Sequence, residues 1–374
     1  MLQKKDNLVF LVTTVGLGGA EMYLLRFIKY LRKNGFSGNI YVLCKSGKTD
    51  GVLLNDFINE NVKVIGCYLG YFNFISWVNL YKLLKQRNYK VICDFTGDFA
   101  GIPLMIAKQV GILKRVVFYR GSTHHFKVDK LRILYWKIVH CLTMRYATSL
   151  LSNSKAAFDF FCKGWQSDVK RKYEVIFNGI PWTAHTDLNV KKLKFTLGIP
   201  ENKKIIGHVG RFCEAKNHKT IIETAINLCE LRDDVIFFLC GPGIPEHLEK
   251  IIKSRNLKNK IFLSGGRRDI RNILKLFDLF YFPSMTEGQP NALLEAIIEE
   301  VPFVASIIDP IKECIPKQWH NQLVGYDDVS GAVSKILEIL DNIENSKKSA
   351  KQLSLKSRDL YNPDKCFVKV LKYL

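Results

Sequence analysis

Short apolar runs alternate with longer amphipathic stretches along the first half of the chain. The apolar runs predict buried strands, which fall at 8–13, 40–44, 62–65, 91–94, 116–119, 149–152 and 174–177. Amphipathic stretches of helical length separate several of them, at 20–33, 76–87, 130–146 and 155–164. Continuously apolar strands that alternate with helices are typical of a parallel sheet covered on both faces.

A polar stretch at 183–189 interrupts this alternation, which then begins again. The second series of strands is predicted at 205–209, 235–240, 260–263, 279–282 and 303–306. Its helices are predicted at 218–231, 245–256, 269–277 and 291–299. A chain of 374 residues has room for two domains. We therefore predict an α/β fold with two Rossmann-like domains that join near residue 182. The ligand should lie at the carboxyl ends of the strands, in a cleft between the two parallel sheets.

Three turns between a predicted strand and a helix contain candidate chemistry, and the first of them follows strand 8–13. It holds Gly16, Gly18 and Gly19, and Glu21 occupies the third glycine position of a GxGxxG dinucleotide motif. Glycines ahead of a helix let the backbone approach an anion. The turn therefore predicts a phosphate or substrate loop, with weaker support for a dinucleotide site and a purely structural tight turn as the alternative.

The second turn follows strand 205–209 and places two cations, Arg211 and Lys216, after Gly210. The planar fork of an Arg and the point charge of a Lys can together hold a diphosphate. A charged surface turn without a ligand would have the same composition, so the turn alone leaves both interpretations open.

The third turn follows strand 279–282 and leads into a helix that we expect to begin near Pro290. Glu287 lies in this turn and Glu295 lies one turn into the helix, and each carboxylate can accept hydrogen bonds from sugar hydroxyls. The N–H groups at the start of the helix would point into the site. They belong to Asn291, Ala292 and Leu293.

Together, the loop at 210–217 and the segment at 287–295 resemble the retaining GT-B glycosyltransferases of the superfamily called glycosyl transferases group 1. Matching segments cover almost the whole chain, at 18–21, 152–155, 175–180 and 278–284. The resemblance implies a GT-B fold with an acceptor-binding domain at 1–182, a nucleotide-sugar-binding domain at 183–358 and a helix at 359–374 that crosses back to the first domain. It also implies transfer of a sugar from a nucleotide-sugar, most often a UDP-sugar, to a glycan or lipid-linked acceptor, as in lipopolysaccharide or capsule biosynthesis.

The resemblance further implies roles for individual residues. Arg211 and Lys216 would neutralise the diphosphate and stabilise it as leaving group, while Glu287 would contact the transferred sugar. Either His124 or His125 would contact the donor sugar or the acceptor. The implied catalytic residues are Glu287, Arg211, Lys216 and His124. The implied donor-binding residues are Gly18, Gly19, Gly210, Gly288, Gln289, Asn291, Ala292, Leu293 and Glu295, the last on the ribose. The implied acceptor-binding residues are Glu21, Arg120 and His125, with Arg120 on an acceptor phosphate; Glu313 would lie near the sugar-binding loop.

The sequence leads us to expect no metal ion and no cofactor beyond the nucleotide-sugar co-substrate. No Asp-x-Asp motif occurs in the chain, and two cations already serve the diphosphate. No carboxylate is placed like the nucleophile of a retaining glycoside hydrolase. Retention would then depend on front-face attack assisted by the leaving phosphate.

Charge is distributed unevenly over the chain, whose formal net charge is +21. Residues 1–183 hold 27 basic and 11 acidic side chains, and residues 184–374 hold 29 and 24. Such an excess favours nucleic acid, an anionic membrane or phosphorylated substrates. Lysine-rich codon usage is an alternative explanation for part of the lysine content, but it does not explain the asymmetry between the two halves. We expect the first domain to meet an anionic membrane surface or a lipid diphosphate.

The uncharged stretch at 64–81 bears on the same question. Its apolar density is below that of a membrane-spanning helix, so a strand end, a loop and a helix start are favoured over a span. An interfacial patch is the alternative, because the stretch is rich in aromatic residues. These are Tyr68, Tyr71, Phe72, Phe74 and Trp77.

The ten cysteines are scattered singly and form no CxxC pair, which argues against a zinc ribbon and favours a reducing compartment. The first residues lead directly into a strand and do not resemble a secretory leader. We therefore expect a cytoplasmic protein that is peripheral on the inner face of the membrane.

Two other functions remain as alternatives. A basic nucleic-acid-binding module would explain the charge, but the chain has no recognisable nucleic-acid motif and the two glutamates would be unexplained. Another GT-B enzyme, such as a UDP-sugar epimerase, would share most of the motifs. Release of UDP from a donor without acceptor would separate an enzyme from a binding module.

Overall fold

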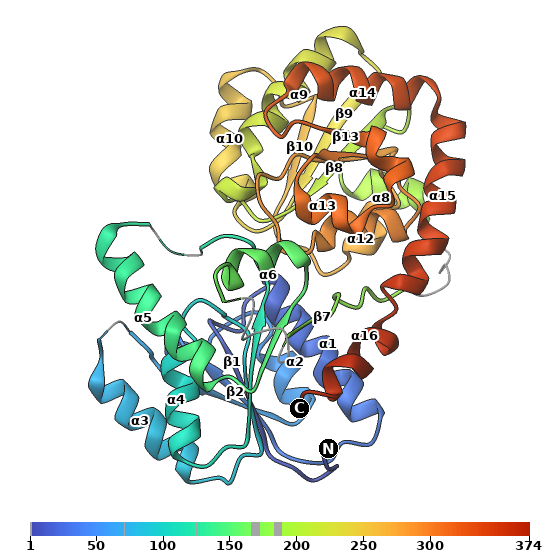
Figure 1. Cartoon of the computed structure of the whole chain (residues 1–374). Coiled ribbons are helices and arrows are strands. Elements are labelled where there is room, and N and C mark those ends of the chain that lie inside the picture. Colours follow the sequence, from blue (N-terminus) through green and yellow to red (C-terminus); the bar gives the residue numbers. More distant parts are fainter. Residues whose placement is uncertain (1, 71, 125, 127, 166–172, 183–188) are drawn as a thin grey trace. The chain divides into compact units, whose positions relative to one another are not determined.

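The computed structural model describes residues 2–70, 72–124, 126, 128–165, 173–182 and 189–374 (Figure 1). Two compact units make up the chain. Unit 1 consists of Met1–Gly179 and Pro363–Leu374, and unit 2 is Ile180–Asn362. The boundaries expected after residues 182 and 358 lie a few residues away from these. Each unit contains one parallel sheet with helices, which confirms the predicted fold class.

Unit 1 is built on a seven-stranded parallel sheet with strand order β3-β2-β1-β4-β5-β6-β7. Its strands are β1 (Leu8–Val12), β2 (Ile40–Cys44), β3 (Val62–Gly66), β4 (Val91–Asp94), β5 (Lys114–Tyr119), β6 (Ser149–Ser152) and β7 (Tyr173–Val175). The central strand β1 pairs with both β2 and β4, so that Val9 lies opposite Tyr41 and Ile92. All strands of this unit were predicted, but β7 ends two residues earlier than the apolar run that predicted it.

Helices cover both faces of this sheet (Figure 1). Leu8, Phe10 and Val12 of β1 pack against α1 (Gly19–Lys33), α2 (Leu54–Asn59) and α16 (Pro363–Leu371). Val9 and Leu11 face the other side. There the sheet is covered by α3 (Phe74–Lys85), α4 (Gly101–Gln109), α5 (Lys130–Tyr146) and α6 (Lys155–Cys162). The period-two alternation of β1 therefore supplies both cores of the unit.

Unit 2 is built on a six-stranded parallel sheet with strand order β10-β9-β8-β11-β12-β13. Its strands are β8 (Lys204–Val209), β9 (Val235–Cys240), β10 (Ile261–Ser264), β11 (Leu279–Phe282), β12 (Phe303–Ser306) and β13 (Leu323–Val324). Its helices are α8 (Val190–Thr196), η1 (Glu214–Lys216), α9 (His218–Leu231), α10 (Ile244–Ser254), α11 (Ile270–Leu274), α12 (Asn291–Ile298), α13 (Asp309–Cys314), η2 (Lys317–Gln322), α14 (Val329–Asp341) and α15 (Ile343–Leu360). The helix predicted at 269–277 is shorter in the structure. Residues after Leu274 turn into β11, and the Asp278 carboxylate accepts a hydrogen bond from the Ile205 N–H at 2.9 Å.

None of the helices in the described ranges combines the length and the apolar character that a bilayer crossing requires. The uncharged stretch at 64–81 forms the end of β3, a loop and the start of α3, as favoured by its composition. The expectation for Tyr71 lies outside the described residues. All ten cysteines are free, and seven of them are buried.

Candidate functional site

Two loops of unit 2 meet at the carboxyl ends of neighbouring strands. One follows β8 and contains η1, and the other follows β11 and leads into α12. The Met285 N–H donates a hydrogen bond to the Ala215 carbonyl at 2.9 Å, which ties the two loops together. Loops at this edge of a parallel sheet are the usual ligand-binding elements of such folds.

An ion pair between Lys216 and Glu287 joins the same two loops. Lys216 Nζ lies 2.5 Å from Glu287 Oε1, and the two side chains are 17% and 11% exposed. The ammonium also lies 4.5 Å from the centre of the Phe282 ring. An ammonium group has three N–H donors, and Lys216 makes no second hydrogen bond to any residue that the structure describes. Two of its donors therefore remain for the oxygens of a ligand.

Gly210 and Arg211 begin the loop that carries Lys216. A Cβ at position 210 would lie 3.0 Å from His208 Nε2 and 3.2 Å from Lys216 Cδ, so a side chain there would crowd the lysine stem. The Arg211 side chain is exposed and makes no ion pair within the described ranges. The loop thus presents one cation held by a carboxylate and one exposed cation without an ion pair among the described residues.

His208 lies in β8 below this loop and was not identified from the sequence. Its Nδ1 is 3.0 Å from the Tyr281 carbonyl, and the side chain is buried. Burial, and then the nearby His218 and Lys216, hold the pKa of His208 well below its ordinary value, against an opposing contribution from the Tyr281 carbonyl. Burial also lowers the pKa of His218 to about 4. Both imidazoles are therefore neutral near pH 7 and add no charge beneath Lys216.

The start of α12 supplies the other predicted donor-binding residues. Pro290 is the N-cap residue, so the helix begins one residue after the predicted proline, at Asn291. Gly288 and Gln289 are buried in the preceding turn, and the Asn291 N–H bonds to the Gln289 carbonyl at 2.9 Å. The amino end of a helix carries a partial positive charge that attracts anions.

Three further residues of α12 differ in what they can offer a ligand. The Leu293 side chain is fully buried, which leaves its backbone as the part that can contact a ligand. Ala292 and Glu295 are half-buried. Burial is the largest cause that raises the pKa of the Cys314 thiol to about 12, and Glu313 and Glu287 both contribute to the same shift. Glu313 in α13 therefore belongs to the same region as Glu287.

In unit 1 the glycine turn lies at the amino end of α1. Gly18 is the N-cap residue and Gly19 is the first helical residue. The Glu21 carboxylate folds back over Gly18, where a Cβ would collide with it. A side chain at position 18 would displace the Glu21 carboxylate, and both residues lie beyond the carboxyl end of β1 as the sequence predicts.

Arg120 follows β5 and is held from several sides. Its guanidinium lies 4.0 Å from the centre of the Tyr23 ring, and Nη2 donates to Asn178 Oδ1 at 2.8 Å. Burial lowers the pKa of Arg120 to about 10, and the nearby Tyr23 and Glu21 oppose this shift. The group stays charged at neutral pH, and it links the end of β5 to α1 and to the segment after β7.

His124 lies in the next turn of the chain, near an aspartate that the sequence reasoning missed. Its Nδ1 is 3.4 Å from Oδ1 of the buried Asp98. The ring also packs against three aromatic side chains, those of Phe126, Trp136 and Phe160. His125, the other predicted histidine, lies outside the described residues.

A second ion pair of unit 1, between Lys45 and Asp94, was also missed. Lys45 Nζ lies 2.8 Å from Asp94 Oδ2, and the side chains are 10% and 0% exposed. The same ammonium donates to Thr96 Oγ1 at 2.6 Å and to the Phe99 carbonyl at 3.3 Å. Lys45 follows β2 and Asp94 ends β4, so the pair lies at the same edge of the sheet as the glycine turn.

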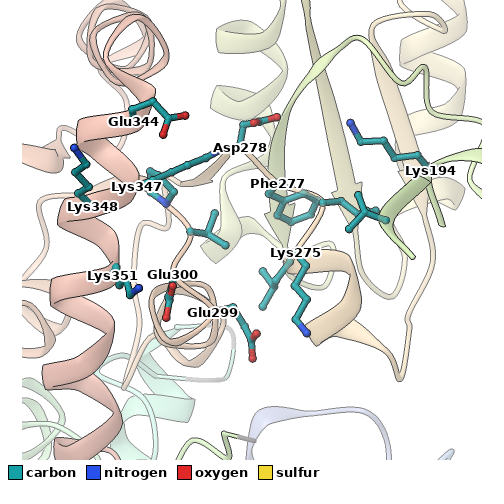
Figure 2. A pocket seen from close by; sticks show the side chains of 15 residues that line it. Lys194, Lys275, Phe277, Asp278, Glu299, Glu300, Glu344, Lys347, Lys348 and Lys351 are labelled. Carbon is teal, nitrogen blue, oxygen red and sulfur yellow. The ribbon is translucent and has the colours of Figure 1, made fainter. Parts of the chain in front are cut away.

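A hollow of about 480 Å³ in unit 2 has a different place in the fold (Figure 2). It is lined by residues 274–278, which precede β11, and by residues 299–302, which precede β12. Lysines of α15, among them Lys347 and Lys351, line another side. The hollow therefore lies at the amino ends of these strands, at the opposite edge of the sheet from Lys216 and Glu287. In the described part of the chain, no three His, Cys, Asp or Glu side chains are grouped so as to hold a metal ion.

The chain is similar to known proteins in sequence and in fold. Residues 189–358 match the family model described as glycosyl transferases group 1. The UDP-Gal:alpha-D-GlcNAc-diphosphoundecaprenol alpha-1,3-galactosyltransferase of Escherichia coli is 25% identical over 342 residues, which are 87% of this chain and 86% of that protein. An N-acetylgalactosamine-N,N'-diacetylbacillosaminyl-diphospho-undecaprenol 4-alpha-N-acetylgalactosaminyltransferase of Campylobacter jejuni is 26% identical over 307 residues, 78% of each chain. Among solved structures, HepE of Anabaena in complex with UDP and glucose has a TM-score of 0.81 at 17% identity and covers 98% of both chains, a likeness of fold.

Proposed function

The chain belongs to the glycosyl transferases group 1 superfamily and has its GT-B fold, and on this premise we propose that it transfers a sugar with retention from a UDP-sugar to a lipid-linked or glycan acceptor. The activity class, glycosyl transfer, follows from the family. We further propose a role in surface polysaccharide biosynthesis. The Escherichia coli and Campylobacter jejuni relatives support the choice of acceptor, because the names of both include a sugar linked to diphosphoundecaprenol.

The observation that carries the proposal is that the Lys216 ammonium, at the carboxyl edge of the unit 2 sheet, has more N–H donors than hydrogen-bond partners among the described residues. Glu287 fixes its position, and two of its N–H donors are not used within the described ranges. In our proposal these donors and the guanidinium of Arg211 bind the donor diphosphate. Fixed cations stabilise the charge that grows on the leaving group as the sugar bond breaks. The amino end of α12 adds its partial positive charge on the same side.

The remaining residues take the roles that follow from their positions. The Glu287 carboxylate would accept from a hydroxyl of the transferred sugar, and Glu295 would accept from the ribose. Gly288, Gln289, Asn291, Ala292 and the Leu293 backbone would line the donor. In unit 1, Glu21, Arg120 and His124 would meet the acceptor or the donor sugar, with Gly18 and Gly19 leaving room for a phosphate. His208 would act as a positioning residue beneath Lys216.

We also propose that the reaction needs no metal ion and that unit 1 meets the cytoplasmic face of the membrane. The cations of the β8 loop can do the electrostatic work that a metal ion would do. The charge excess of residues 1–183 favours an anionic surface, which is where a lipid-linked acceptor would be found.

A donor panel tests the proposal directly. Purified protein would be incubated with UDP- and GDP-sugars in EDTA, with and without an undecaprenyl-diphosphate-linked sugar. We expect nucleotide release from one UDP-sugar, stimulated by the acceptor, and a product in which NMR shows the anomeric configuration of the donor. Silence on every donor, or an inverted product, would contradict the activity or its stereochemistry respectively. Loss of turnover in EDTA that added Mg²⁺ restores would contradict metal independence.

A further inference from the structure

The outer faces of two helices of unit 1 expose large apolar side chains. In α5, Leu131, Leu134 and Ile138 are 80%, 58% and 55% exposed. Their spacing of three and four residues places them along one side of the helix, opposite the buried His140 and Thr143. In α3, Phe74, Ile75 and Val78 are 68%, 76% and 52% exposed. Burying such side chains is favourable, so an exposed set of six suggests a surface that is covered in use.

The two helices belong to the same side of unit 1. Both contribute to the core on one face of the seven-stranded sheet, and α4 packs against each of them (Figure 1). The Phe72 ring, just before α3, lies 4.6 Å from the Tyr135 ring of α5. We call the six exposed apolar residues and the cations beside them the α3–α5 surface.

Cations accompany these apolar residues and acids do not. Lys82 and Lys85 are exposed on the outer side of α3, one and two turns after its apolar residues. The exposed cations of α5 are Lys130, Arg132, Lys137 and Arg145. Neither helix contains an Asp or Glu; Asp129, the N-cap residue of α5, is the acid next to that helix in the sequence, and it pairs with Arg132 at 3.3 Å. The surface therefore has both an apolar and a positive component.

Helix α1, on the other face of the same sheet, offers the contrast that gives this combination its meaning. It carries four cations, among them the exposed Lys29 and Lys33, but no exposed large hydrophobic residue. Positive charge alone is thus common to both faces of unit 1. The exposed apolar side chains distinguish the face that is formed by α3 and α5.

We propose that the α3–α5 surface docks unit 1 onto an anionic lipid bilayer, with the apolar side chains in the headgroup region and the lysines and arginines against lipid phosphates. The inference deepens the proposed function and rests on it for the biological setting, since a lipid-linked acceptor would lie in that bilayer. Helices with an apolar stripe flanked by cations bind in the plane of the interface. Long cationic side chains can reach the phosphates while their stems stay among apolar neighbours.

Two other occupants fit the surface less well. A second copy of this chain, joined by a two-fold axis, would bring the same cations against each other, with Asp129 as their one acidic neighbour in these helices. A nucleic acid would meet the cations but would leave the aliphatic side chains without a partner, because its affinity comes chiefly from phosphate contacts. Both occupants are outcomes that the experiment below can detect.

The position of Cys141 makes the proposal testable on the full chain. It follows Leu134 by seven residues and Ile138 by three, so it lies on the same side of α5, and it is the exposed one among the ten cysteines. An environment-sensitive maleimide dye would be attached there, and the control would carry the dye on Lys29→Cys in a Cys141→Ser background. We expect the dye at position 141, and not that at position 29, to shift to shorter wavelength on phosphatidylglycerol–phosphatidylcholine vesicles. No shift at position 141 on vesicles that bind the protein would overturn the proposal.

Variants separate the apolar and the electrostatic parts of the contact. One triple variant replaces the apolar residues by Gln: Leu131→Gln, Leu134→Gln and Ile138→Gln. It should lower partition onto anionic vesicles about tenfold or more at any salt concentration, since each replaced side chain no longer buries apolar surface in the bilayer. A second triple variant removes three cations: Lys130→Gln, Lys137→Gln and Arg145→Gln. It should lower partition onto anionic vesicles by a similar factor at low salt, and by little at high salt. Lys29→Gln with Lys33→Gln, on α1, should leave partition within about twofold. Equal losses in the α1 control would reject the α3–α5 surface as the site.

The remaining outcomes distinguish this proposal from the proposed function. Sedimentation velocity would show whether the apolar variant dissociates a dimer, and RNA binding of both triple variants would be measured in parallel. Dissociation of a dimer or loss of RNA binding, without a loss of vesicle binding, would overturn the proposal. Turnover with a water-soluble acceptor should be the same in the α3–α5 variants and the parent. Vesicle binding without turnover on any donor would contradict the glycosyltransferase assignment alone, whereas turnover without vesicle binding would contradict the docking surface alone.

Discussion

Each unit has a lysine–carboxylate pair at the carboxyl edge of its parallel sheet, and the two pairs differ in how fully the lysine is used. Lys45 of unit 1 gives its ammonium to the Asp94 carboxylate, the Thr96 hydroxyl and the Phe99 carbonyl. Lys216 of unit 2 has one hydrogen-bond partner among the described residues, Glu287. Since an ammonium has three N–H donors, Lys45 is saturated within its own unit and Lys216 is not.

The partners of the two carboxylates extend this difference. Asp94 also accepts hydrogen bonds from the Thr96 N–H at 2.8 Å and from its hydroxyl at 2.5 Å. A buried pair with such a network holds β2 and β4 together but has nothing left for a ligand. The comparison teaches that the number of unused donors, more than burial or charge, separates a structural lysine from one that can bind substrate.

Replacing Lys216 should have the largest effect on activity. In Lys216→Ala the diphosphate loses a fixed cation, and we expect turnover to fall about 100- to 1000-fold, as when one preorganised donor to a developing anion is removed. Unfolding free energy should fall by only about 1–2 kcal/mol, because one pair is lost at an edge that water can reach. Steady-state kinetics with the best donor and urea unfolding would measure the two quantities.

A neighbouring lysine provides the matched control for this variant. Lys219 lies one turn further on, in α9, with an 85% exposed side chain that is 4.0 Å from Glu223. Lys219→Ala removes the same charge from the same region and should change turnover by less than about twofold. If both alanine variants lost activity equally, general electrostatics rather than the free donors of Lys216 would explain the loss.

Replacing Lys45 should lower the free energy of unfolding and leave turnover almost unchanged. Lys45→Met leaves the Asp94 carboxylate buried without its cation, and breaking one partner of a buried pair costs about 3 kcal/mol or more. The turnover of the folded protein, measured well below its melting temperature, should stay within about threefold of the parent, because no donor of Lys45 is available to a ligand. Hydrogen exchange in the peptides of β2 and β4 would report the loss of stability.

Two further variants complete this test. Lys48→Met changes an exposed lysine of the same loop and should leave exchange in β2 and β4 unchanged. Adding Asp94→Asn to Lys45→Met removes the unpaired charge and should recover part of the lost protection. Retained protection together with lost turnover in Lys45→Met would mean that this lysine contacts substrate.

The contrast between the two lysines also marks where sequence reasoning succeeds and where it stops. Apolar runs located the strands, and the cations and glutamates of the β8 and β11 loops stood out because they follow those runs. The bond between Lys216 and Glu287 could not be predicted, because it depends on β8 and β11 being neighbours although β9 and β10 lie between them in the chain. Strand order of this kind is set by crossover packing, which leaves no local signal in the sequence.

Other residues were missed for identifiable reasons. His208 lies inside an apolar strand, and nothing in its neighbours shows that its ring reaches the loop above. Lys45 and Asp94 did leave a signal, since each is a charged residue at the carboxyl end of an apolar run. Helix α4 was not predicted because 101–107 is almost wholly apolar and shows no helical period of polar residues.

Lowering the pH should also change the stability of the two units unequally, with a smaller effect than the lysine variants. Burial lowers the pKa of His140 in unit 1 to about 4, and that of His218 in unit 2 to about 4, with His208 beside it also well below the ordinary value. A histidine whose pKa is lower in the folded state stabilises the protein above the unfolded pKa of about 6.5, and this stability is lost as the pH falls toward the folded value. Near pH 5.5 the loss is about 1.4 kcal/mol for each histidine.

Unit 2 should therefore lose about twice as much stability as unit 1 between pH 7.5 and 5.5, because it contains two of these histidines. Hydrogen exchange, corrected for the intrinsic effect of pH, would measure the loss separately in β1 and in β9. His218→Gln should reduce the difference between the units, and His140→Gln should enlarge it, whereas His247→Gln, at an exposed position, should leave it unchanged. Equal losses in the two units would show that carboxylates, distributed over both, govern acid stability in place of the imidazoles beneath Lys216.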